Sequence, residues 1–205
     1  MIDKICLFLT NKIRQEIPDI DDERAEVINY GLQIIVGEVP KIFIMLAVAY
    51  LLGVFKLSVI TFAILIPYRG ASGGFHLHTH IGCIISTCIM YSGVALLSKY
   101  LVFTQVVKYL LIAGTWIFGT IMIKLYAPAD TEDVPILESK VRKKKQIVSY
   151  LSLTIGLVAA LFIQDSAISN ILIFGNLVQT LTITRLAYRL TNNKYGYEVY
   201  GDASI

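Results

Sequence analysis

Charged side chains are scarce in this chain, and their scarcity excludes most classes of soluble protein. Only 16% of the 205 residues are charged, whereas 56% are hydrophobic and the mean hydropathy is +0.67. Soluble domains carry about 25% charged residues. The composition therefore predicts an integral membrane protein, and its length leaves no room for a separate soluble domain beside several spans.

Other shortages narrow the function further. The net charge is only +3, and the basic residues do not alternate with aromatics, so nucleic acid is not an expected partner. Three cysteines, Cys6, Cys83 and Cys88, show no disulfide-framework spacing, which predicts at least one free thiol in a reducing compartment. The first apolar run, ICLFL, lacks a small-residue cleavage site, so a removable signal peptide is not expected.

Apolar periodicity predicts an all-α polytopic membrane protein with five or six membrane helices and an N-terminal amphipathic interfacial helix. That first helix, residues 1–17, repeats apolar residues at spacings of three and four, and it either lies in the membrane interface or packs against the bundle. We assign 24–190 to a helical bundle and 191–205 to a cytoplasmic tail of one membrane-embedded domain. The apolar stretches lie at 42–55, 57–67, 81–98, 106–125, 146–163 and 168–188.

Three of these stretches have unusual features. The first follows Gly37, Glu38 and Pro40, which predicts either one kinked helix or two helices. The stretch at 57–67 falls short of the roughly 20 residues that a span needs, so it is expected to be re-entrant or partly buried. The last stretch carries polar residues whose favoured role is helix packing, namely Asn176, Gln179, Thr180, Thr182 and Thr184.

Positive charge concentrates just before the span at 146–163, at Lys140, Arg142, Lys143, Lys144 and Lys145. This run predicts that the loop at 126–145 is cytoplasmic. Counting back through two spans places residues 69–80 on the same side, and counting forward places the tail there. Lys99 and Lys108 fall on the opposite side and count against this orientation.

Residues 69–83, RGASGGFHLHTHIGC, combine an arginine, three histidines and a thiol at the border of an apolar stretch. A free cysteine has a pKa near 8.5, and a nearby imidazole is the commonest means of raising its thiolate fraction. His80 would reach Cys83 within one helical turn, whereas seven helical residues rise about 10.5 Å and separate His76 from it. Gly73, Gly74 and Gly82 would permit the fold-back that His76 needs. Spacing therefore leaves both histidines open.

Other interpretations compete with a reactive thiol. The cysteines are equally compatible with small buried residues of a membrane helix, beside interfacial histidines. His76, His78 and His80 are alternatively ligands of a metal or haem, in a non-enzymatic transporter or metal-binding protein. Arg69 is expected at the membrane boundary or in a wet cavity, as a topological anchor, a ligand for a substrate carboxylate, or a residue that orients the loop.

Taken together, these residues resemble one known family. Arg69, the pair Gly73–Gly74, His76 and Cys83, in this order and spacing, with YAPADTEDVPI at 126–136 before an RKKK run, are similar to the AgrB family. The resemblance covers the whole chain and implies a membrane cysteine endopeptidase of accessory gene regulator quorum sensing. It implies that Cys83 is the nucleophile, that His76 activates it, and that Arg69, Gly73 and Gly74 support them. No role is carried over for His78 or His80.

The resemblance also implies the reaction and the partners. The enzyme would cleave the C-terminal part of an AgrD-like propeptide through a thioester and assist its cyclisation to a thiolactone or lactone. No cofactor is implied, because thioester exchange is nearly balanced in energy. Membrane lipids and a second copy of the chain are the other implied partners. The run at 140–145 either attracts an acidic propeptide tail or lipid headgroups, or is a topology signal alone. The expected location is the bacterial cell membrane, with Cys83 and His76 on the cytoplasmic side.

Overall fold

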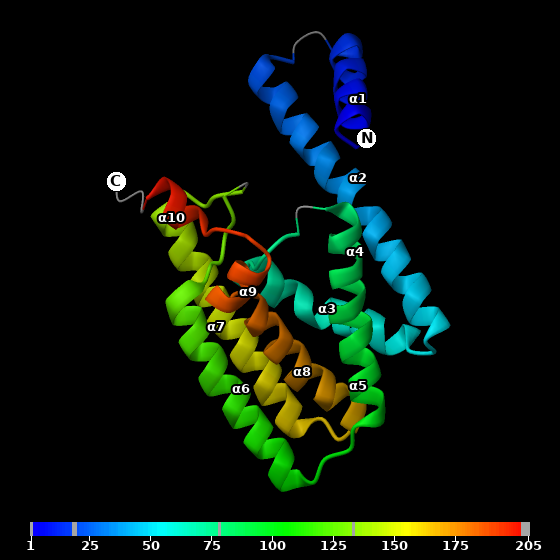
Figure 1. Ribbon diagram of the computed structural model, residues 1–205, viewed down its shortest axis with the longest axis vertical. Helices are drawn as coiled ribbons and strands as arrows, with labels where there is room; N and C mark the ends of the chain where they lie inside the picture. Colours follow the sequence, from blue (N-terminus) through cyan, green and yellow to red (C-terminus); the bar gives the residue numbers. More distant parts are fainter. Residues whose placement is uncertain (1, 18–19, 78, 133, 202–205) are drawn as a thin grey trace.

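The computed structural model describes residues 2–17, 20–77, 79–132 and 134–201, and within these ranges the chain is helical and has no strands (Figure 1). The all-α prediction is therefore confirmed. The elements are α1 (Ile2–Glu16), α2 (Asp22–Leu51), α3 (Phe55–Ser72), α4 (His80–Cys88), the π-helical turn η1 (Ile89–Gly93), α5 (Val94–Tyr100), α6 (Gln105–Tyr126), α7 (Ser139–Phe162), α8 (Ser166–Thr182), α9 (Arg185–Leu190) and α10 (Gly196–Tyr200).

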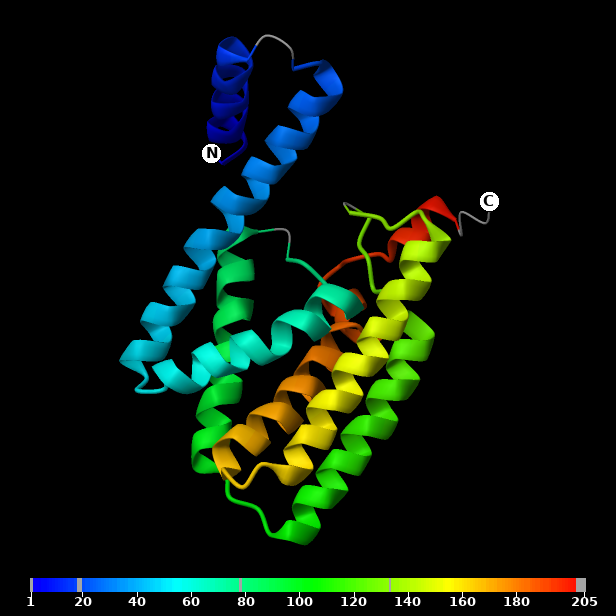
Figure 2. The ribbon, with the colours of Figure 1, turned by 180° about the vertical axis from the view of Figure 1, so that it is seen from behind.

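Four helical segments of the described chain are long and apolar enough to cross a membrane: α2, the continuous segment His80–Tyr100, α6 and α7. The two remaining predicted membrane helices, α3 and α8, have 18 and 17 residues. A perpendicular crossing takes about 20 residues. α3 contains the stretch at 57–67 and runs across α4 in both views (Figure 1, Figure 2). The short stretch is thus part of an oblique helix.

Several helices begin at a side chain that caps their free backbone N–H groups. Asp21 accepts from the N–H of Arg24 at 2.8 Å, and Asp165 accepts from the N–H of Ile168 at 3.0 Å. Thr79 performs the same role for α4, with its hydroxyl 3.1 Å from the N–H of Gly82. Each cap stabilises a helix start by about 1 kcal/mol. The cap at Thr79 fixes where α4 begins.

Helix α8 lies at the centre of the bundle and packs against α3, α5, α6 and α7. Its polar side chains are buried, and most find partners inside the bundle. Thr180 shares a hydrogen bond of 2.9 Å with Tyr68 of α3, and the amide of Asn176 donates to the carbonyl of Leu172 at 2.6 Å. Buried polar groups need such partners because they are removed from water. The bond between Thr180 and Tyr68 joins α8 to α3 and agrees with the predicted helix-packing role, whereas the bond of Asn176 lies within α8.

The N-terminal helix packs along the first half of α2, and the two project away from the other helices in both views (Figure 1, Figure 2). Cys6 is buried in their contact, and Arg14 forms an ion pair of 2.6 Å with Asp22. Helix α2 continues through Pro40. Of the two predicted alternatives, one kinked helix or two helices, the structure therefore has a single helix.

The segments 73–77, 127–132 and 191–201 meet at the same end of the bundle (Figure 1). The spans counted from the sequence lead to the same arrangement. Residues 191–201, which the sequence assigns to a tail, fold back onto the bundle, where Tyr195 is buried and stacks on Tyr188 with ring centroids 4.0 Å apart. This end of the bundle holds the candidate site.

Candidate functional site

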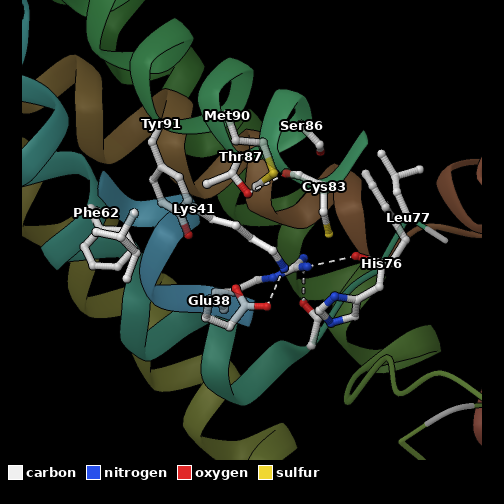
Figure 3. A pocket seen from close by; sticks show the side chains of 14 residues that line it. Glu38, Lys41, Phe62, His76, Leu77, Cys83, Ser86, Thr87, Met90 and Tyr91 are labelled. Carbon is white, nitrogen blue, oxygen red and sulfur yellow. Dashed lines mark hydrogen bonds and ion pairs between the residues drawn. The ribbon is translucent and has the colours of Figure 1, made fainter. Parts of the chain in front are cut away.

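A pocket of about 400 Å³ opens between α2, the end of α3 and the start of α4. Cys83 and His76 both line it, and Figure 3 shows the sulfur of Cys83 pointing toward the side of the pocket where the His76 ring lies. His80, the first residue of α4, is exposed and lies outside the pocket lining. The other lining residues are Glu38, Lys41, Ile42, Phe62, Arg69, Gly73, Phe75, Leu77, Ser86, Thr87, Met90 and Tyr91.

Cys83 lies in the first turn of α4 and is partly exposed to the pocket. Its backbone N–H donates to the carbonyl of Thr79 at 3.0 Å, and its own carbonyl accepts from the hydroxyl of Thr87 at 2.8 Å. Both bonds hold the backbone beneath the thiol. The N-terminal turn of a helix carries partial positive charge, which favours the thiolate form of a cysteine.

The chain folds back before His76 at two glycines in left-handed backbone conformations. Gly73 has φ +71° and Gly74 has φ +136°. A Cβ atom at Gly73 would collide with the backbone of Ala129, and one at Gly74 would collide with the guanidinium of Arg69. Only glycine avoids both the strained backbone and the collision. This turn brings His76 and Cys83 to one pocket although seven residues separate them.

The guanidinium of Arg69 holds this turn by hydrogen bonds to its backbone carbonyls. Its Nη1 donates to the carbonyl of Gly73 at 3.3 Å and to the hydroxyl of Thr182 at 3.0 Å, while its Nη2 donates to the carbonyl of Phe75 at 2.9 Å. These are the contacts of a residue that orients the loop. Arg69 also interacts electrostatically with Cys83.

Two further side chains, those of Gln179 and Asn193, form hydrogen bonds with the same loop, and neither was predicted at the site from the sequence. The amide nitrogen of Gln179 in α8 donates to the hydroxyl of Ser72 and to the carbonyl of Gly73, both at 2.9 Å. Asn193 donates to the carbonyl of His76 at 2.7 Å. The polarity of the stretch at 168–188 pointed toward Gln179, whereas no signal in the sequence singled out Asn193.

With this geometry described, the chain can be compared with known proteins. The sequence profile of the family Accessory gene regulator B matches residues 6–183. The chain belongs to this family. An AgrB-like protein of Listeria innocua is 28% identical over 182 residues, covering 88% of this chain and 87% of the relative. One from Clostridium acetobutylicum is 27% identical, with 80% and 77% covered.

The Accessory gene regulator protein B of Staphylococcus aureus is 25% identical over 182 residues, covering 89% of this chain and 91% of the relative. No solved structure matches the chain. Membership of the AgrB family, together with four helices able to cross a membrane, supports a membrane protein with a role in the accessory gene regulator system.

In this AgrB-family chain the arginine of the predicted basic run has an ion-pair partner within the protein, whereas its four lysines are partly or fully exposed. Arg142 is turned inward, where its Nη1 lies 2.9 Å from the buried carboxylate of Asp130 and its guanidinium covers the ring of Tyr197. Lys145 is partly exposed and lines a second, smaller pocket of about 170 Å³ together with His76. The other members, Lys140, Lys143 and Lys144, are exposed. A role in attracting substrate thus stays a prediction for the lysines, while Arg142 also has a structural partner.

A residue of α2 that sequence reasoning did not place at the site also faces the pocket. Lys41 is only 7% exposed, and its ammonium lies 2.6 Å from the carboxylate of Glu38. Both residues line the same pocket as Cys83. A lysine after Pro40, at the start of an apolar stretch, was the available signal, but the sequence was interpreted there only as a helix kink.

The alternative metal site rested on three histidines. Among the described residues, no group of three or more His, Cys, Asp or Glu side chains is placed to hold a metal ion. His78 lies outside the described residues, so the full set of His76, His78 and His80 is not tested, and the metal alternative stays a prediction.

Proposed function

We propose that this chain is a membrane cysteine endopeptidase that processes an AgrD-like propeptide for quorum sensing. The observation that carries the proposal is that the Cys83 thiol and the His76 ring line one pocket, at the end of a loop held by Arg69. Membership of the AgrB family supports the choice of substrate.

In the first step the imidazole of His76 takes the thiol proton, and the sulfur of Cys83 attacks the carbonyl carbon of a peptide bond in the propeptide. The C–N bond then breaks, and the leaving amine receives a proton from the imidazolium. The C-terminal fragment departs, and the remainder stays attached to Cys83 as a thioester.

In the second step the neutral imidazole of His76 takes the proton of a cysteine thiol or serine hydroxyl within the propeptide, and the freed sulfur or oxygen attacks the thioester carbonyl. The C–S bond to the enzyme breaks, the ring closes as a thiolactone or lactone, and the thiolate of Cys83 is regenerated. Water must be kept away from the thioester during this step. Much of the pocket wall is apolar, with Ile42, Phe62, Leu77 and Met90 among the lining residues, which would limit competing hydrolysis.

The location and partners follow from the same proposal. We place the pocket at the cytoplasmic side of the bacterial membrane, because the basic start of α7 lies at the same end of the bundle. An amphipathic propeptide lying on that membrane surface would meet Cys83 at the border of the apolar stretch. The homodimer that the family resemblance implies is retained as a prediction.

The proposal is tested by co-expressing the chain with an AgrD-like propeptide and measuring propeptide cleavage. Cys83→Ala and His76→Ala should abolish cleavage, whereas Cys88→Ala should not. Cys88 is a matched control because it is a partly exposed cysteine of the same helix, five residues further on. His80→Ala should retain most of the activity, since that residue lies outside the pocket lining.

A variant that traps the intermediate makes the test sharper. Replacing the ring-closing cysteine or serine of the propeptide by alanine should accumulate a thioester on Cys83, seen by mass spectrometry and released by hydroxylamine. Normal cleavage by Cys83→Ala, with the protein correctly inserted, would reject the proposal.

A further inference from the structure

Lys41 is a buried cation in the pocket, and the reaction described above gives it no task. Its side chain extends from α2 into the pocket, where its ammonium contacts the carboxylate of Glu38 at 2.6 Å (Figure 3). Burying an ammonium group removes it from water at a considerable cost in free energy, which one ion pair seldom offsets. A lysine in this position therefore calls for an explanation beyond the stability of α2.

The two cations that line the pocket differ in what occupies their donors. The guanidinium of Arg69 donates to Gly73, Phe75 and Thr182, so the protein itself uses both Nη atoms. The ammonium of Lys41 has three N–H donors. Among the contacts of the described residues, it donates to Glu38. Of the two cations, Lys41 is therefore the one whose remaining N–H groups can donate to a ligand.

The partner of Lys41 is well placed to leave. The side chain of Glu38 is 54% exposed, whereas that of Lys41 is 9% exposed. Glu38 precedes Lys41 by three residues on the same helix, and because the ammonium is buried, Glu38 can be released only when another anion takes over the charge pair. A rotation of Glu38 toward the pocket opening would release the ammonium without any backbone movement.

We infer that Lys41 binds a carboxylate of the peptide substrate, and that Glu38 occupies this subsite when the pocket is empty. The inference rests on the proposed function, since it assigns a subsite to that reaction. A neutral group that displaced Glu38 would leave a buried ammonium without a counter-charge, whereas a carboxylate restores the charge pair. The ligand is therefore an anionic group of the peptide, either an Asp or Glu side chain near the scissile bond or the chain-terminal carboxylate.

The first experiment needs no propeptide and compares two alkylating agents of similar size. Iodoacetate carries a carboxylate and iodoacetamide does not, so the ratio of their rates at Cys83 reports on a carboxylate subsite. It is measured in a Cys6→Ser, Cys88→Ala background, where Cys83 is the remaining thiol. Lys41→Met should lower the ratio by about tenfold, the value of one charge-assisted hydrogen bond.

Two further variants separate this role from a structural one. Glu38→Gln breaks the same ion pair but leaves Lys41 free, so it should raise the ratio, in the direction opposite to Lys41→Met. A merely structural pair predicts that both variants change the ratio in the same direction. Lys56→Met removes an equal charge from an exposed site at the far end of α3 and should leave the ratio unchanged. If Lys41→Met does not fold, the rise expected for Glu38→Gln still decides.

The second experiment identifies the source of the carboxylate. Each Asp or Glu of a propeptide that the wild-type protein cleaves is replaced by Asn or Gln, and in a separate arm the C-terminus is amidated. One of these changes should raise KM about tenfold in the wild type and have no further effect in Lys41→Met. Equal effects in both proteins would overturn the inference.

The two proposals can fail separately. If the chain cleaves no propeptide but Lys41→Met and Glu38→Gln shift the alkylation ratio in opposite directions, the carboxylate subsite is supported and the peptidase proposal is rejected. If the chain cleaves propeptide but Lys41→Met leaves the alkylation ratio unchanged, the peptidase proposal is supported and the carboxylate subsite is rejected.

Discussion

Arg69→Lys should abolish most of the activity although the substitution keeps the positive charge. In the structure the guanidinium bridges acceptors that lie on both of its Nη atoms: the carbonyls of Gly73 and Phe75 and the hydroxyl of Thr182. A lysine ends in one nitrogen, which cannot occupy both Nη positions. At least the bond of 2.9 Å to Phe75 or the pair of bonds at Nη1 must be lost.

The size of the effect follows from these contacts. A hydrogen bond from a charged donor contributes about 1.5–3 kcal/mol. The loss of one such bond, taken at about 2 kcal/mol, lowers the population of the correctly folded loop about thirtyfold relative to its alternatives. Because the loop orients His76 relative to Cys83 rather than binding substrate, both loop forms should bind substrate alike, so kcat should fall while KM changes little. A residue that bound a substrate carboxylate would instead raise KM, and lysine would replace it in part.

Two assays check this reasoning. Propeptide cleavage gives kcat and KM for the wild type and the variant, and alkylation of Cys83 by neutral iodoacetamide reports on the thiol in the empty enzyme. Both kcat and the alkylation rate should fall in Arg69→Lys. Cleavage within about twofold of the wild type, or a loss confined to KM, would refute the role of Arg69 as the residue that holds the loop.

Three other outcomes follow from the structure. Gly74→Ala places a Cβ atom against the guanidinium of Arg69 and strains a backbone that has φ +136°. Propeptide cleavage should therefore fall at least about tenfold, while the far-ultraviolet circular dichroism spectrum stays unchanged. Asp130→Ala removes a buried carboxylate and leaves the partly buried Arg142 without its ion-pair partner, so it should lower the free energy of unfolding by about 3 kcal/mol in thermal melts. The exposed control Lys143→Gln should change it by less than about 0.5 kcal/mol. Burial raises the pKa of Tyr197 from 10.0 to about 12, so the stability it contributes is complete below pH 10 and is lost as pH rises toward about 12. The tyrosinate absorbance of this ring, taken as the difference between the wild type and Tyr197→Phe, should therefore rise near pH 12, and a rise near pH 10 would contradict the burial of this segment.

A site that combines Cys83 with a histidine could be proposed from local sequence because the residues concerned lie within fifteen positions, and the structure shows that Cys83 and His76 line one pocket. Spacing left His76 and His80 open, since an ideal helix would favour the nearer one. The structure has an irregular segment there, in which Gly73 and Gly74 turn the chain. Glycine marks where such a turn can form, but which histidine it brings to the thiol depends on the tertiary contacts of the loop.

The tertiary contacts of this loop could not be predicted from sequence patterns. Asn193 and His76 are 117 residues apart, and Asn193 stands in a polar segment that the composition assigned to a tail. Lys41 and Glu38 reach the pocket because α2 packs against α4, an arrangement that periodicity within either helix does not determine. Helical period predicts which face of a helix is apolar, whereas it does not predict which two helices face each other.

The bond from Asn193 to the backbone of His76 has a consequence for the timing of folding. A ribosome delivers the chain from its N-terminus, so the histidine and cysteine enter the membrane well before residue 193 is translated. Until then the loop lacks one of its anchors, and chains that stall or are truncated before this point would carry an incompletely ordered candidate site. The proposed activity would thereby depend on translation past residue 193, so that shorter copies would not consume propeptide.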